Sequence, residues 1–284
     1  MNLTDDIETN ILLRNNSPLN DFLGLSPSEI HDLVYETFGD KSPVQFRDNI
    51  DNETLDQIPL FRIAEEFLKI IYRDKQIKLT PLGALPKKVM VELYDKRFLL
   101  DEHIESGLTK LWKEDDCIAI QSARLTAQLA GLVRKANGKL TLTKAGTKLL
   151  ETDNRLQIFK QFFKAFVDKF SWSYNDGYPK EPIGQLAWAL SIIILDKFGD
   201  QPQYIDLYAD KYLKAFPIFI TFFEHRFTTP ERQFYRCYGV RTFDRFFLWF
   251  GFVTVDKQKN YLDIDSDKYK RTELVRSIFR FKKV

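Results

Sequence analysis

Apolar residues recur every three or four positions through most of this chain, and this periodicity constrains the fold more than any other feature of the sequence. The strongest case is the segment 59–72, where one helix face is formed by Leu60, Ile63, Ala64, Phe67, Leu68 and Ile71. Alternating runs that would indicate strands are few and short. The sequence therefore predicts a mainly α fold with short β-hairpins near residues 76–80, 139–143 and 252–264.

A well-marked helix is expected shortly after residue 25. Ser26 can cap it, Pro27 suits its first position, and Glu29 has the spacing of a capping box. Gly39 stands where a helix of this length would end.

Two segments of the chain share a short pattern. The pattern is a lysine, a short apolar strand, Leu-Thr-x-x-Gly and then a helix, and it occurs at residues 75–85 and 137–149. In the second copy an apolar helix precedes Asn137-Gly138, which favours a tight turn between two strands, and Thr143 can cap the helix that follows. Helix, hairpin and helix in this order predict a winged-helix-like unit.

A third winged-helix-like unit is expected near the C-terminal end. Pro230 follows a capping residue, Gly239 can end the first helix, and Thr242 can cap a second helix over 243–250. Residues 252–255 and 261–264 would then form the hairpin. The fold prediction is thus tandem winged-helix-like units.

Three strings carry a resemblance: GLSPSEIHDLVYETF at 24–38, KLTPLGALPKKVMVELY at 78–94 and GLVRKANGKLTLTKAG at 131–146. They resemble an uncharacterised bacterial family whose members carry Gly-Leu-Ser-Pro, Leu-Thr-x-x-Gly-x-Leu-Pro and a winged-helix ending. The likeness spans about residues 20–150. It implies a shared fold and supplies no catalytic residue.

The expected organisation has three parts. Residues 1–58 form an acidic N-terminal helical segment, 59–152 a tandem winged-helix-like domain, and 153–284 an aromatic-rich helical domain ending in a winged-helix-like unit. The first 60 residues carry a net charge of −9 and the remainder +11. Such an asymmetry fits an internal packing of opposite charges or an anionic partner.

Sequence composition favours a cytoplasmic protein. The longest apolar runs, 186–195 and 215–223, are shorter than the roughly 20 residues that a membrane helix needs. No signal peptide is expected at the N-terminus, and no membrane partner. The two cysteines, Cys117 and Cys237, have neither Cys-x-x-Cys spacing nor a paired histidine.

Motifs that carry enzyme chemistry are absent from the sequence, so we expect a non-enzymatic protein without catalytic residues, cofactor or metal. The sequence contains no Gly-x-Gly-x-x-Gly, no phosphate-binding loop and no Gly-x-Ser-x-Gly. The three histidines are far apart, and the acidic run 263–267 lacks the later residues of a calcium loop.

Nucleic acid binding is the expectation with a physical mechanism. The second helix of a helix-turn-helix enters the major groove, so its outward face should be polar. We expect this outward face to carry Gln121, Arg124 and Gln128, opposite Leu125 and Leu129. Lys139 on the hairpin could reach a phosphate. Two partner classes stay open: double-stranded DNA for a regulator, or a protein for a docking or scaffold module. The sequence does not indicate an oligomeric state.

The C-terminal tail 268–284 is the most basic stretch, with a local net charge of +6. Read as a helix, it has an apolar stripe formed by Leu274, Val275, Ile278 and Phe279. The favoured interpretation is that the stripe docks on the body while the basic side chains are solvated or paired internally.

Overall fold

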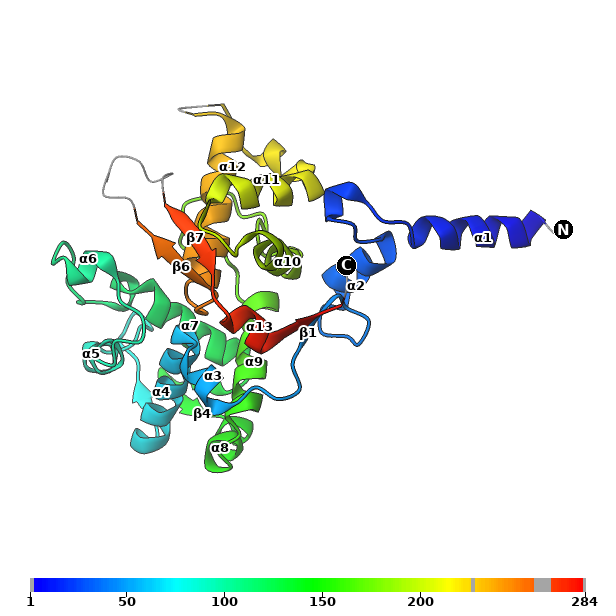
Figure 1. The fold of residues 1–284 in the computed structure, drawn as a ribbon. Helices are drawn as coiled ribbons and strands as arrows, with labels where there is room; N and C mark the ends of the chain where they lie inside the picture. The colour runs from blue at the N-terminus through cyan, green and yellow to red at the C-terminus, as the bar shows by residue number, and fades with distance from the viewer. Residues whose placement is uncertain (1–2, 226–227, 258–266, 283–284) are drawn as a thin grey trace. The chain divides into compact units, whose positions relative to one another are not determined.

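The computed structural model describes residues 3–225, 228–257 and 267–282, and these group into two compact units (Figure 1). Unit 1 is built from the described parts of 1–49, 172–248 and 252–284, and unit 2 from 50–171 and 249–251. The described residues are mainly helical and contain three small antiparallel sheets, of two, three and three strands. The mainly α prediction is confirmed at this level.

Unit 2 is built around a long amphipathic helix. Its helices are α3 (Asn52–Asp56), α4 (Pro59–Asp74), α5 (Lys87–Tyr94), α6 (Glu102–Glu105), α7 (Ile118–Leu129), α8 (Lys144–Glu151) and α9 (Arg155–Asp168), with the short turn η2 (Glu114–Asp116). Its strands are β2 (Ile77–Lys78), β3 (Val133–Ala136) and β4 (Lys139–Leu142). The predicted stripe of α4 is buried throughout and forms the centre of this core.

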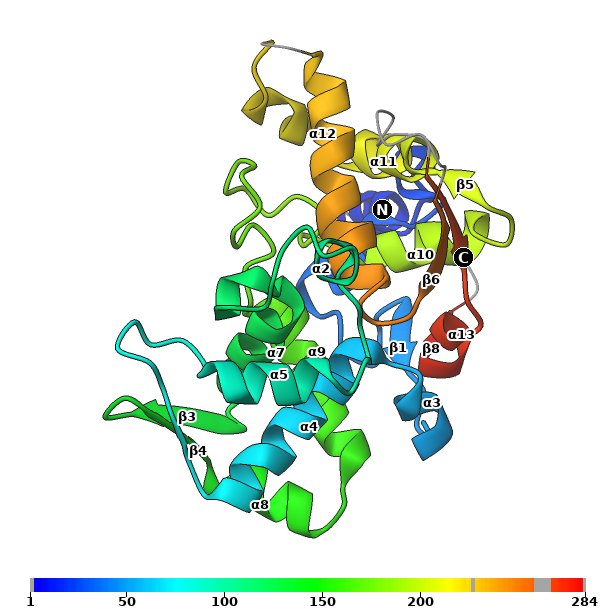
Figure 2. The same cartoon turned by 90° about the vertical axis from the view of Figure 1, so that its left-hand side faces the viewer.

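The sheet of unit 2 has the order β2-β4-β3. Figure 2 shows its β3 and β4 strands side by side. Ile77 pairs with Leu140 and Lys78 with Lys139, while β3 and β4 form the expected hairpin around Asn137-Gly138. The two copies of the sequence pattern at 75–85 and 137–149 are therefore neighbouring strands of one sheet and not the ends of two modules. The hairpin expected at 76–80 is wrong, because β2 has its only described strand partner in β4.

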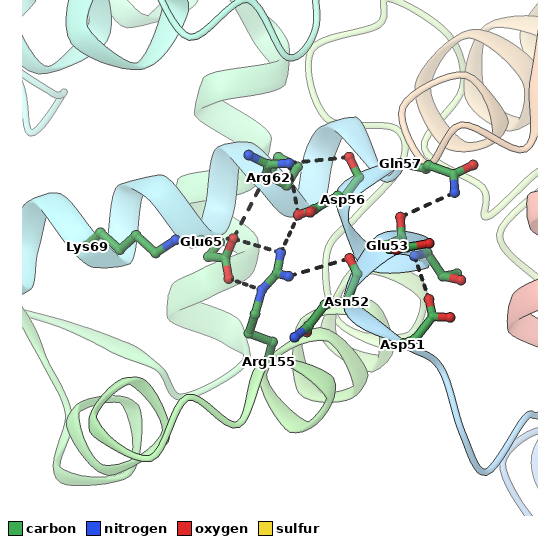
Figure 3. A network of polar contacts seen from close by, with 10 residues as sticks. Asp51, Asn52, Glu53, Asp56, Gln57, Arg62, Glu65, Lys69 and Arg155 are labelled. Atoms are coloured by element: carbon green, nitrogen blue, oxygen red, sulfur yellow. Dashed lines mark hydrogen bonds and ion pairs between the residues drawn. The ribbon is translucent and has the colours of Figure 1, made fainter.

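A network of ions joins three helices of unit 2 (Figure 3). The carboxylate of Glu65 on α4 is 4% exposed and accepts hydrogen bonds from Arg155 Nε at 2.6 Å and Nη2 at 3.1 Å. Arg155 at the start of α9 also donates to Asp56 on α3 at 2.8 Å. This hydrogen bond lowers the pKa of Asp56. The guanidinium thus fixes the ends of α3 and α9 against the side of α4.

Unit 1 joins the two ends of the chain. Its helices are α1 (Leu3–Asn15), α2 (Pro27–Tyr35), α10 (Trp188–Phe198), α11 (Ile205–Ala215), α12 (Pro230–Tyr238), η4 (Gly239–Phe247) and α13 (Leu274–Ile278), with the turns η1 (Asn20–Phe22) and η3 (Pro217–Phe222). Its strands are β1 (Val44–Phe46), β5 (Gln203–Tyr204), β6 (Val253–Asp256), β7 (Lys268–Arg271) and β8 (Phe279–Phe281). β1 pairs with β8 in one sheet, and the other has the order β5-β7-β6.

The start of α2 agrees with the sequence. Glu29 N–H donates to Ser26 Oγ at 3.3 Å, and Ser26 N–H donates to the Glu29 carboxylate at 2.8 Å. This is the expected capping box, with Pro27 at the first helical position. The helix nevertheless ends at Tyr35, four residues before Gly39.

The predicted helix-turn-helix at 230–250 is wrong. Thr229 caps α12 as the sequence pattern indicates, but Gly239 keeps helical dihedral angles and the chain continues as the π-helix η4. A Cβ at Gly239 would lie 3.2 Å from Ile205, so this glycine serves the close packing of α11. The partner strand expected at 261–264 lies outside the described residues, as does the acidic run up to residue 266; β6 pairs with β7 instead.

The C-terminal tail is only briefly helical. It forms β7, α13 and β8, and the predicted stripe Leu274, Val275, Ile278 and Phe279 is buried. Arg276 pairs with Asp196 at 2.7 Å and Arg280 with Asp48 at 3.3 Å. These basic side chains are therefore paired within unit 1, as the favoured interpretation had it.

The glycine of the Leu-Thr-x-x-Gly pattern has a packing role that can be tested. A Cβ at Gly146 in α8 would lie 2.3 Å from the Leu132 carbonyl oxygen, in backbone that cannot move cheaply. We expect Gly146→Ala to lower the free energy of unfolding by about 1–3 kcal/mol, although alanine is the better helix former.

The control is Ala145→Gly at the exposed neighbouring position, which should cost about 1 kcal/mol from helix propensity alone. Urea unfolding measures both variants. A stabilised Gly146→Ala protein would contradict the close approach of α8 to Leu132.

Candidate nucleic-acid interface

Helix α7 is the segment from which the sequence predicted base contacts, and the structure buries most of it. Gln121 is 4% exposed and Arg124 7%, Gln128 is half-buried, and Leu129 is 40% exposed. The expected orientation is wrong, because the polar face points inward and Leu129 points toward solvent.

Small side chains explain this orientation. The buried positions of α7 include Ala119, Ser122, Ala123, Thr126 and Ala127. Small residues let neighbouring helices approach closely, and α4 and α9 pack against this helix. The sequence prediction placed the core on the larger leucines and so chose the wrong side of the helix.

The charge of Arg124 is neutralised inside unit 2. Its guanidinium forms a two-point ion pair with Glu114, through Nε to Oε1 and through Nη2 to Oε2 at 3.1 Å. The Glu114 side chain is 1% exposed and also accepts the Leu85 backbone N–H at 2.9 Å. The pair thus links α7, η2 and the segment before α5.

The two glutamines of α7 also bond to groups of the chain itself. Gln121 Nε2 donates to the Asp115 carboxylate at 2.7 Å, and Gln128 Nε2 donates to the Arg124 carbonyl at 3.3 Å. The fourth predicted contact to nucleic acid, Lys139, lies on strand β4 and is half-buried.

Lys139 belongs to a cationic sheet face, defined by Lys78, Arg134 and Lys139. Residues alternate between the two faces of a strand, and cross-strand partners share a face. Lys78 is the direct partner of Lys139, and Arg134 is the partner of Thr141, to whose hydroxyl it donates at 3.2 Å. The opposite face of the same strands is buried through Ile77, Val133 and Leu140.

The two segments that supply the strands of this face contain no acidic residue. Residues 75–91 and 131–150, which supply the three strands, contain nine Lys and Arg and no Asp or Glu. Within the described part of the chain, no carboxylate lies within ion-pairing distance of the three cations. This face cannot be recognised from the sequence, because the two segments are about 50 residues apart and meet only through the β2–β4 pairing.

Other chemistry has little support in the described residues. No three His, Cys, Asp or Glu among them are grouped to hold a metal ion. The helices that the structure describes include none long and apolar enough to cross a bilayer.

The Arg124–Glu114 pair gives a stability prediction. Arg124→Ala leaves the Glu114 carboxylate buried without its cation, which typically costs about 3–5 kcal/mol. We expect urea unfolding to show a loss of that size. The double variant Glu114→Gln/Arg124→Met removes both charges and should be more stable than Arg124→Ala alone. Equal stability of Arg124→Ala and the wild type would show that the pair is not formed.

One known protein family matches part of this chain. The family model of the Y4jL N-terminal domain matches residues 56–155, which run from the end of α3 to the start of α9 and include the cationic sheet face. No curated protein and no solved structure matches the chain. The match covers less than half of the sequence and lies wholly within unit 2.

Proposed function

We propose that this chain is a non-enzymatic bacterial protein with two winged-helix-like units, and that unit 2 binds double-stranded DNA through its cationic sheet face. The observation that carries the proposal is that the pairing of β2, β4 and β3 places Lys78, Lys139 and Arg134 on one face of the sheet. The resemblance to a bacterial family with a winged-helix ending, noted from the sequence, points the same way.

Strand topology supports the winged-helix assignment. In unit 2 the order along the chain is α4, β2, α5, α7, β3 and β4, with the short elements α6 and η2 between α5 and α7, and the last strand lies between the other two. Unit 1 has a similar order with α10, β5, α11, α12–η4, β6 and β7, with η3 between α11 and α12, and its sheet order β5-β7-β6 is equivalent. A first strand, two helices and a returning hairpin with this pairing are the arrangement of a winged helix.

The proposed contact is to the phosphate backbone and not to base edges. Helix α7, which would enter the major groove in a helix-turn-helix, has its polar side chains bonded within unit 2. Lys78, Arg134 and Lys139 are long cations of the kind that bind phosphate, with no requirement for sequence. We therefore expect salt-dependent binding with weak sequence preference.

The register of the sheet gives a physical reason for an anionic partner. Lys78 and Lys139 are direct cross-strand partners, and like charges in that position destabilise a sheet. A phosphate placed between them would remove the repulsion. The pair is thus a feature that folding alone disfavours and that anion binding explains.

A protein-docking module is the second candidate function. It is favoured by apolar side chains that unit 2 exposes, among them Leu82 at 96% and Trp112 at 63% exposure. Exposed aromatic residues are enriched where proteins bind one another. Salt dependence discriminates the two functions, since docking through such residues needs no phosphate.

The test of the DNA proposal is the double variant Lys78→Gln/Lys139→Gln. Duplex binding at low salt should weaken by at least about tenfold, and the slope of log K against log salt should fall by about 2, because two phosphate contacts are lost. The free energy of unfolding should stay equal or rise, because the repulsion between the two lysines is removed. Fluorescence anisotropy and urea unfolding measure the two quantities.

The matched control is Lys197→Gln, which removes an exposed lysine of unit 1 and should leave duplex affinity unchanged. Wild-type protein that shows no salt-dependent duplex binding would reject the proposal and favour the docking module. A double variant that binds duplex DNA as tightly as the wild type would also reject the proposal.

A further inference from the structure

A cavity of about 300 Å³ lies in unit 1. It is bordered by the junction of α12 with η4, the loop before α10, the first residue of α11 and the start of β7. The lining residues are Tyr178, Ile205, Tyr235, Arg236, Gly239, Val240, Asp244, Asp267 and Tyr269. Its volume is at the lower end of the range found for small-molecule sites.

One wall of the cavity is a π-helix. The nine residues of η4 adopt this rare geometry, which occurs frequently at functional sites. It presents Asp244 to the cavity and directs Arg241 and Arg245 to the loop 174–181. The unusual helix and the cavity therefore belong to one arrangement.

The loop that carries Tyr178 is held firmly against η4. Arg241 and Asp176 form an ion pair at 2.5 Å whose two side chains are fully buried. Arg241 also donates to the carbonyls of Pro179 at 2.6 Å and Glu181 at 2.7 Å. A buried, multiply bonded guanidinium of this kind fixes the loop, so this wall of the cavity is preformed.

Asp244 is the carboxylate of the cavity without a cation. Its described hydrogen bond is from the Tyr269 hydroxyl to Oδ1 at 2.8 Å. Arg245, one residue further along η4, donates instead to the carbonyls of Tyr174 at 2.8 Å and Asn175 at 3.1 Å. In the described part of unit 1, no cation forms an ion pair with Asp244.

The electrostatic surroundings of Asp244 favour a positive ligand. Burial raises the pKa of this carboxyl to about 6, while the hydrogen bond from Tyr269 lowers it. The charge of Asp267 raises this pKa, and the charges of Lys257 and Arg245 have smaller effects that lower it. A cation placed beside Asp244 would offset both the burial and the repulsion. Burial also raises the pKa of Tyr269, so its hydroxyl stays a donor.

We propose that this cavity binds a small organic ammonium ion, with Asp244 as the anionic partner and tyrosine rings as apolar walls. Tyr178, Tyr235 and Tyr269 all line the cavity, and aromatic rings stabilise desolvated ammonium groups. Arg236 also contributes to the lining and is exposed, whereas Asp244 and Asp267 are half-buried. This site is independent of the DNA proposal.

The test compares three probes of similar shape on the full-length chain: phenethylammonium, the neutral 2-phenylethanol and the anionic 3-phenylpropanoate. Calorimetry and ligand-observed NMR should show saturable binding of phenethylammonium, with the other two at least about tenfold weaker, since only the cation pairs with Asp244. This comparison uses the wild type, so it does not depend on the folding of any variant.

The variant Asp244→Asn keeps an oxygen that accepts the Tyr269 hydrogen bond but removes the charge. It should weaken phenethylammonium binding by about tenfold or more and leave 2-phenylethanol binding unchanged. The matched control is Asp40→Asn, an exposed carboxylate of unit 1 outside the cavity, which should bind as the wild type does.

Three results would overturn the proposal. They are a wild type without saturable phenethylammonium binding, an Asp244→Asn protein that binds this probe with wild-type affinity, and tighter binding of 3-phenylpropanoate than of phenethylammonium. The last result would assign the cavity to anions through Arg236.

Discussion

Unit 2 depends on the nearly complete burial of α7. Its small side chains allow α4 and α9 to pack closely on it, and its inner face buries polar groups, of which the hydroxyls of Ser122 and Thr126 have no hydrogen-bond partner in the described part of the chain. Arg124 is the extreme case, because its charge is tolerated only with Glu114 beside it. The same pair fixes η2 on α7, and so covers the surface that a recognition helix would need.

Local sequence signals predicted local structure well. The capping box of Ser26 and Glu29, the cap of α12 by Thr229 and the apolar stripe of α4 each depend on residues within a few positions of one another. Such signals act through short-range sterics and hydrogen bonds that every chain with these residues shares. Local signals also predicted the β3–β4 hairpin, whose tight turn is formed by Asn137-Gly138.

Features that depend on distant residues could not be predicted in this way. The pairing of β1 with β8 joins segments more than 230 residues apart, and the pairing of β2 with β4 turns an apparent repeat into one sheet. For α7, periodicity shows that a helix has an apolar face, but small and large apolar residues compete for the core. Only the neighbours decide, and here they favour alanine over leucine. The π-helix also depends on distant residues. The local sequence around Gly239 predicts a helix end, but in the structure this glycine packs closely against Ile205 within a continuing helix.

The distribution of paired and unpaired charges separates structural from functional residues. Where this fold buries a cation, it supplies a carboxylate: Arg124 has Glu114, Arg241 has Asp176 and Arg271 has Asp200 at 2.5 Å. Folding has thus satisfied charges wherever burial demanded it. Within the described residues, Asp244 has no ion-pair partner, and neither do the three cations of the sheet face, although these are not buried. Because like charges side by side weaken the fold, we propose a ligand of opposite charge at each site, an anion at the sheet face and a cation beside Asp244.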